Sequence, residues 1–133
     1  MPQRREAAIV GLYEYPLRVN PYVSAMQIKA ECAAQALADA GLTWKDVDAV
    51  YDTGGDQGIG GLGASEYFGF HPRVIDTTYV GGTSTEFQTN HARAMIAAGK
   101  CNVALVTYGS TSHSDRRAIG TAGETGVGVP TVT

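Results

Sequence analysis

The chain has 133 residues, and 44% of them are hydrophobic, which is enough for one buried core but not for two. Its formal net charge is −3, and its charges are interspersed without a basic stripe, which argues against nucleic acid as a partner. No apolar run approaches the roughly 20 residues of a membrane span, and the start lacks the pattern of a signal peptide. We therefore expect one cytoplasmic domain.

The two cysteines predict no special chemistry. Cys32 and Cys101 lie far apart, without CxxC or metal-ligand spacing, so neither a disulfide framework nor a metal site is expected. Both are predicted to be buried thiols.

The first elements are a strand and a long helix. Residues 7–15 combine β-branched and aromatic side chains after a charged start, which predicts a buried strand. A helix then begins after Ser24 as N-cap and ends at Gly41. Four residues recur along it at i+4 spacing and predict its buried face: Ile28, Cys32, Ala36 and Ala40.

Strands and helices alternate through the rest of the chain. The pattern predicts a helical turn capped by Thr43, a short helix at 61–70, a helix at 83–100, and strands at 47–51, 72–80 and 101–110. This alternation predicts an α/β fold with a mostly parallel sheet covered by helices on both faces. The residues from 110 onward show neither helical nor strand periodicity and predict a loop.

A glycine motif offers one function. Gly58, Gly60 and Gly63 match G-x-G-x-x-G, and Asp76 ends the next predicted strand, where a dinucleotide site has its ribose-binding acid. However, extra residues separate the preceding strand from the motif, the helix after it is short, and the motif is not in the first βα unit. A flexible glycine loop explains the same residues, and NAD binding stays a minor alternative.

Three stretches, "ALADAGLTWKDVDAVYD", "HARAMIAAGKCNVALVTYGS" and "SDRRAIGT", occur in an order and at a spacing that resemble the N-terminal half of the thiolase superfamily. The similarity is closest to the thiolase-like lipid-transfer proteins, which include sterol-carrier-type thiolases and steroid side-chain aldolases. The resemblance implies a thiolase-like βαβαβαβ half. It divides the chain into a domain at 1–108 and, at 109–133, the start of the family's loop region in a truncated chain.

The resemblance also gives a role to the turn "VGGTS". Active thiolases carry their acyl-accepting cysteine between the third strand and the buried helix, and counting back from Gly99 puts that position on Gly82. A thiol there would be acidified by the helix N-terminus. The turn thus looks like a nucleophile site without its nucleophile, and its N–H groups could bind an anion or an enolate oxygen. Gly81, Thr83 and Ser84 are the predicted substrate-binding neighbours, and Thr83 or Ser84 is expected to cap the helix.

Other side chains are weighed against simpler roles. Tyr79 is a candidate for proton transfer, although a tyrosine at a strand end is more often a packing residue. His113 follows the carboxyl end of a strand, where α/β sheets place their sites, and is a second catalytic candidate. Arg116 and Arg117 could bind CoA phosphates, although a surface arginine pair needs no ligand. His91 is predicted to be structural.

Two functions of different classes follow from the resemblance. One is an acyl-CoA C–C lyase or acyltransferase, or the N-terminal half of one, that lacks the nucleophilic cysteine. It would act on lipid or steroid CoA thioesters, with retro-aldol C–C cleavage as the expected reaction. The other is a non-catalytic scaffold that binds acyl-CoA or a partner subunit. The expected substrate is a coenzyme A thioester, with no covalently bound cofactor. A homodimer and an OB-fold companion subunit are implied partners, and the isolated 133 residues are expected to be inactive.

Overall fold

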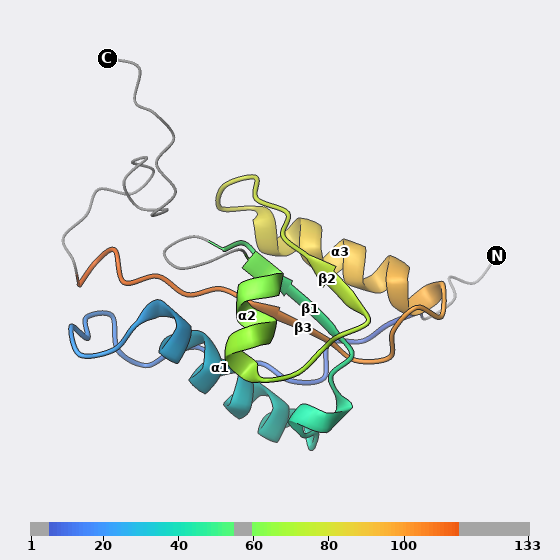
Figure 1. The fold of residues 1–133 in the computed structure, drawn as a ribbon, viewed down its shortest axis with the longest axis horizontal. Coiled ribbons are helices and arrows are strands. Elements are labelled where there is room, and N and C mark those ends of the chain that lie inside the picture. The colour runs from blue at the N-terminus through green and yellow to red at the C-terminus, as the bar shows by residue number, and fades with distance from the viewer. Residues whose placement is uncertain (1–5, 55–59, 115–133) are drawn as a thin grey trace, which may run out of the picture.

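The computed structural model describes residues 6–54 and 60–114, which form a parallel sheet with helices around it (Figure 1). The strands are β1 (Ala49–Asp52), β2 (Val74–Asp76) and β3 (Ala104–Thr107), in the spatial order β2-β1-β3. The helices are α1 (Ala25–Ala40), the short 3-10 helix η1 (Trp44–Asp46), α2 (Gly60–Phe68) and α3 (Ser84–Ala97). The α/β class and the parallel sheet predicted from the sequence are confirmed.

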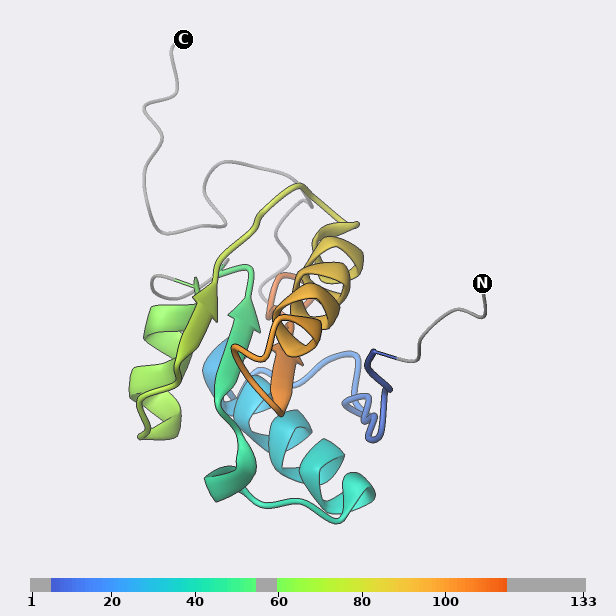
Figure 2. The ribbon, with the colours of Figure 1, turned by 90° about the vertical axis from the view of Figure 1, so that its right-hand side faces the viewer.

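Helices lie on both faces of the sheet (Figure 2). On one face, α1 and α2 pack around Val50 and Leu105. On the other face, α3 packs over Ala49 and Tyr51. All four residues of β1 are buried, as expected for the central strand of a parallel sheet with both faces covered.

The ends of α1 follow from local sequence. The Ser24 hydroxyl accepts a hydrogen bond from the Gln27 N–H at 3.1 Å, and the Gln27 side chain accepts one from the Ser24 N–H at 2.7 Å. This capping box satisfies N–H groups that have no partner inside the helix. At the other end, Gly41 adopts φ +70°, the left-handed conformation that glycine tolerates best. Both predicted caps are confirmed.

The predicted buried face of α1 is wrong by one position. Ile28, Cys32, Ala36 and Ala40 are only half-buried. The fully buried residues are instead Ala25, Met26, Lys29, Ala33 and Leu37. The prediction missed this face because it contains a lysine. As a consequence Cys32 is only half-buried, whereas Cys101 is buried as predicted.

The predicted first strand is also wrong. Residues 7–15 run beyond β3, on its side away from β1, and form no strand (Figure 2). Ile9, Val10 and Leu12 are 81%, 62% and 78% exposed. Strand-forming composition is a local property, but a strand also needs the main chain of a neighbour, and no ladder partner lies beside this segment among the described residues.

Candidate functional site

The candidate site is the turn between β2 and α3, at the carboxyl-end edge of the sheet (Figure 1). Residues 77–83 lead from Asp76 to the start of α3 at Ser84. The N-terminus of a helix directs free N–H groups and the positive end of the helix dipole outward. The turn therefore offers a local environment that favours an anion.

Ser84 closes this turn with its side chain. Its hydroxyl accepts a hydrogen bond from the Val80 N–H at 2.9 Å and donates one to the Gly81 carbonyl at 2.6 Å. Ser84 is buried, and its own N–H donates to the Gly81 carbonyl at 3.2 Å. The hydroxyl is thus committed to the turn, which accounts for Ser84 structurally and leaves it poorly placed as a nucleophile.

The two glycines of the turn differ in what they require. Gly81 has φ +82°, where a side chain would be strained. Gly82 is exposed and has no positive φ, and a Cβ built on it would meet nothing within 4 Å. The backbone therefore needs glycine at position 81 but not at position 82. A cysteine side chain would fit at 82, the position to which the thiolase resemblance assigns the missing nucleophile.

The other predicted site residues that lie within residues 60–114 are exposed. Thr83 is the N-cap of α3, but its side chain makes no capping hydrogen bond. Tyr79 is 61% exposed and does not pack in the core. His113 is exposed in the segment after β3. Arg116 and Arg117 lie outside the described residues.

A polar network ties the end of β2 to α3. The Asp76 carboxylate accepts hydrogen bonds from the N–H and the hydroxyl of Thr78 at 2.7 Å and 2.6 Å. It also pairs with His91 Nδ1 at 2.8 Å. Gln88 Nε2 donates to the Thr78 carbonyl at 3.2 Å. His91 and Gln88 thus hold the strand end that leads into the turn, which gives His91 the structural role predicted for it.

The electrostatics of this network follow from its contacts. Burial acts to raise the pKa of Asp76, but the hydrogen bonds from Thr78 and the pairing with His91 outweigh it and lower the pKa below its ordinary value. The pKa of the neighbouring Tyr51 shifts in the opposite direction. Burial, then Cys101 and Asp76, raise its pKa to about 12. Tyr51 therefore stays protonated near neutral pH.

The sequence did not reveal a buried ion pair at the carboxyl end of β1. Lys29 Nζ lies 2.9 Å from Asp52 Oδ1, and both side chains are 1% exposed. Nζ also donates to the Gly54 carbonyl at 2.9 Å, and the Thr107 hydroxyl donates to Asp52 Oδ2 at 2.6 Å. The network joins α1 to the ends of β1 and β3. The lysine within the apolar face of α1 was the available signal.

Gly60 of the dinucleotide motif and its neighbour Gly61 have a packing role. A Cβ on Gly60 would lie 1.9 Å from the Thr77 side chain, and one on Gly61 would lie 2.6 Å from Ile75. The Gly61 N–H donates to the Thr77 hydroxyl at 3.0 Å. These glycines let α2 approach β2 closely. Gly58 lies outside the described residues, and the NAD alternative stays a prediction.

Neither a metal cluster nor a membrane helix is found in the part of the chain that the structure describes. Residues 6–54 and 60–114 contain no group of three or more metal-ligating His, Cys, Asp or Glu side chains. None of their helices is both long enough and apolar enough to cross a bilayer.

Comparison with known proteins supports the fold. No family model and no curated protein matches the chain. Among solved structures, it is similar to a monomeric SCP2-thiolase-like protein type 1 from Mycobacterium smegmatis, with a TM-score of 0.59 and 24% sequence identity. The chain has a thiolase-like fold. The match covers 74% of this chain and 22% of that protein, so the chain spans less than a quarter of its length.

Proposed function

We propose that this chain is the acyl-CoA-binding, N-terminal part of a thiolase-like enzyme that cleaves C–C bonds without an acyl-enzyme. The observation that carries the proposal is Gly82. The turn before α3 has room for a nucleophilic side chain there, has none, and uses the nearby Ser84 hydroxyl to close itself. What remains is a helix N-terminus suited to a negatively charged oxygen.

Retro-aldol cleavage fits such a site. A base removes the hydroxyl proton of a β-hydroxyacyl-CoA, the Cα–Cβ bond breaks, and the electron pair moves into the thioester enolate. The N–H groups at Gly82 and Thr83 would stabilise the enolate oxygen. Tyr79, exposed within the turn, is the first candidate for proton transfer, and His113 is the second.

The proposed substrates are lipid or steroid CoA thioesters. Exposed apolar side chains lie beside the turn: Tyr79, Val80 and Phe87 are 61%, 50% and 50% exposed. They would contact an apolar acyl group, while cationic side chains such as Arg116 and Arg117 would bind CoA phosphates. A homodimer and an OB-fold companion subunit remain proposed partners.

The test is an assay of a branched β-hydroxyacyl-CoA with the longer enzyme of which this chain would be the N-terminal part, because the isolated 133 residues are expected to be inactive. It is read by product release and by intact protein mass. We expect a ketone and a shortened acyl-CoA, with no mass added to the protein. Gly82→Cys should gain an acyl adduct from an acyl-CoA, because a thiolate is stabilised at a helix N-terminus. Ala98→Cys, an exposed position at the other end of α3, is the matched control and should gain none.

Three results would redirect this proposal. An acyl adduct on the unaltered chain would contradict the missing nucleophile. Binding of the CoA thioester without cleavage would favour the non-catalytic scaffold. That second candidate is supported by the pairing of Asp76 with His91, the titratable side chains that contact the turn through Thr78 and already have each other as partners. Tight NAD binding would favour the dinucleotide site.

A further inference from the structure

Two buried polar atoms between the sheet and α3 have no hydrogen-bond partner. They are the hydroxyl of Tyr51 on β1 and the side-chain carbonyl oxygen, Oε1, of Gln88 on α3, the buried side-chain atoms without a partner within residues 6–54 and 60–114. Both residues are 0% exposed. Such atoms are rare in folded proteins, because burial removes the hydrogen bonds that bulk water would give them. The proposed CoA chemistry uses neither atom.

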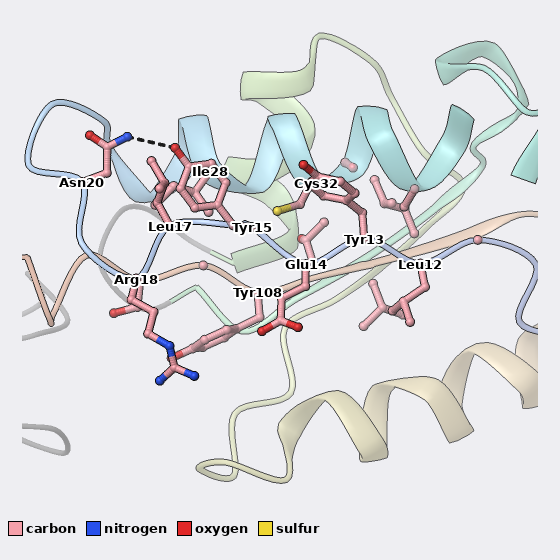
Figure 3. A pocket seen from close by; sticks show the side chains of 18 of the residues that line it. Leu12, Tyr13, Glu14, Tyr15, Leu17, Arg18, Asn20, Ile28, Cys32 and Tyr108 are labelled. Carbon is pink, nitrogen blue, oxygen red and sulfur yellow. Dashed lines mark hydrogen bonds between the residues drawn. The ribbon is translucent and has the colours of Figure 1, made fainter. Parts of the chain in front are cut away.

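Another tyrosine of the molecule shows the usual arrangement. A groove of about 360 Å³ lies between the N-terminal segment, α1 and the end of β3 (Figure 3). Tyr15 lines this groove, and its hydroxyl accepts a hydrogen bond from Asn20 Nδ2 at 3.0 Å. The polar end of Tyr15 is thus satisfied inside the protein, whereas that of Tyr51 is not. The groove is lined by neither Tyr51 nor Gln88, so it is not the place where their partner lies.

Tyr51 and Gln88 face each other across one interface. Tyr51 belongs to the buried cluster that also contains Ala92 of α3. The buried residues of α3 are Ser84, Gln88 and Ala92. A spacing of four residues places side chains on the same side of a helix, so Gln88 faces the sheet together with Ala92. Both unpartnered side chains therefore point into the space between β1 and α3.

Common neighbours bring the two side chains to the same part of this interface. Tyr51 lies opposite Asp76 in the register of β1 and β2. The Asp76 carboxylate pairs with His91 Nδ1 of α3 at 2.8 Å. His91 follows Gln88 by three residues, a spacing that makes the two side chains neighbours on the helix. Asp76 thus borders Tyr51 on the sheet and reaches the helix beside Gln88.

The contacts of Gln88 decide which end of its amide lacks a partner. Nε2 donates to the Thr78 carbonyl at 3.2 Å. Turning the amide over would place Oε1 against that carbonyl, and two acceptors cannot bond to each other. Oε1 therefore needs a donor. The Tyr51 hydroxyl is a donor near neutral pH, because burial above all raises its pKa to about 12, yet no hydrogen bond joins the two side chains.

We infer that an internal water molecule binds between β1 and α3, where it accepts a hydrogen bond from the Tyr51 hydroxyl and donates one to Gln88 Oε1. Water is the smallest molecule that does both, and buried waters typically bind polar groups that lack protein partners. A divalent cation fits less well, because it needs several oxygen ligands and would not accept a hydrogen bond from a hydroxyl. The water would link the central strand to the helix that begins at the turn, whether or not CoA binds there.

The test follows the transfer of magnetisation from water to the isotope-labelled chain by NMR. We expect NOEs from water to the Gln88 Nε2 protons and to the Tyr51 ring, with the sign of a long-lived bound water. Gln35 is the matched control, since it is exposed on α1 and should show only the sign of rapidly exchanging surface water. Tyr51→Phe removes one of the two partners and should weaken the NOE at Gln88 about threefold or more. Met95→Leu, at an exposed position of α3, should leave it unchanged.

Urea unfolding of Tyr51→Phe, Gln88→Met and the double variant tests the link independently. Each single variant leaves one buried polar group without its bridge and should raise the unfolding equilibrium constant about tenfold or more. The double variant removes both groups, so its effect should stay near that of Gln88→Met instead of reaching the product of the two. Absence of a long-lived water at Gln88, or an undiminished NOE in Tyr51→Phe, would overturn the inference. So would effects that simply multiply, or coupling without a water NOE, which would indicate a direct bond between the side chains.

Discussion

Residues 7–15 and β1 have similar strand-forming side chains, but only β1 forms a strand. In β1 every residue is buried, and Val50 is 0% exposed. In the N-terminal segment Val10 is 62% exposed and unpaired. β1 has a strand on each edge and helices on both faces, whereas the N-terminal segment borders a groove that α1 and β3 also line. A strand is thus decided by its neighbours more than by its own residues.

The largest effect should come from the ion pair at the end of β1. Lys29→Met leaves the buried Asp52 carboxylate without its cation, and we expect the free energy of unfolding to fall by about 3–5 kcal/mol. Urea unfolding measures it. Lys45→Met is the matched control at an exposed position and should change stability by less than about 0.5 kcal/mol. A loss below about 1 kcal/mol in Lys29→Met would contradict the buried pair.

A matched pair of valine truncations addresses the comparison directly. Val50→Ala should lower the free energy of unfolding by about 2–3 kcal/mol, because it opens a cavity between α1, α2 and the sheet. Val10→Ala should lower it by less than about 0.5 kcal/mol in the isolated chain. Equal losses would show that the N-terminal segment is packed like β1. Thermal and urea unfolding both report the difference.

The network at the end of β2 should give a smaller, pH-dependent effect. Asp76→Asn weakens the hydrogen bonds to Thr78 and His91 and should cost about 1–3 kcal/mol at neutral pH. Because the folded pKa of Asp76 lies below the unfolded value, its contribution is complete above about pH 4 and is lost as the pH falls through the folded pKa. The difference in the free energy of unfolding between the unaltered chain and Asp76→Asn should therefore become smaller as the pH falls. A difference that grows on acidification would contradict the lowered pKa of Asp76.

The smallest effect should distinguish the two glycines of the turn. Gly81→Ala forces a side chain into the left-handed region and should cost about 1–2 kcal/mol. Gly82→Ala meets open space and should leave stability within about 0.5 kcal/mol. If both substitutions cost the same, position 82 would need glycine for structural reasons, and the account of a vacant nucleophile position would lose its basis.

Local signals predicted the parts of the fold that depend on nearby residues. Ser24 and Gly41 mark the ends of α1 through hydrogen bonds that span only a few positions. Whether residues 7–15 form a strand could not be predicted from their own side chains, because a strand also needs a neighbouring main chain that is far away in the sequence. The buried face of α1 was misplaced because Lys29 is charged, and its partner Asp52 lies 23 residues away.

The site shows the same division. The position of Gly82 at the start of a helix was predictable from the glycine pair and the resemblance to thiolases. The contact between Asp76 and His91 was not, because it joins a strand to the second turn of a helix 15 residues later. Ser84 was expected as a possible cap, but its hydroxyl bonds the turn before the helix, a geometry that only the folded chain reveals.

The most direct test of the central claim is NMR mapping of a CoA thioester on the isotope-labelled chain. The account predicts that acetyl-CoA shifts the amide resonances of Gly82, Thr83 and Ser84 and that free CoA shifts them less, since the thioester oxygen would meet the N-terminus of α3. Unchanged amide resonances at Gly82, Thr83 and Ser84, with shifts around Gly60 and Gly61 instead, would contradict it.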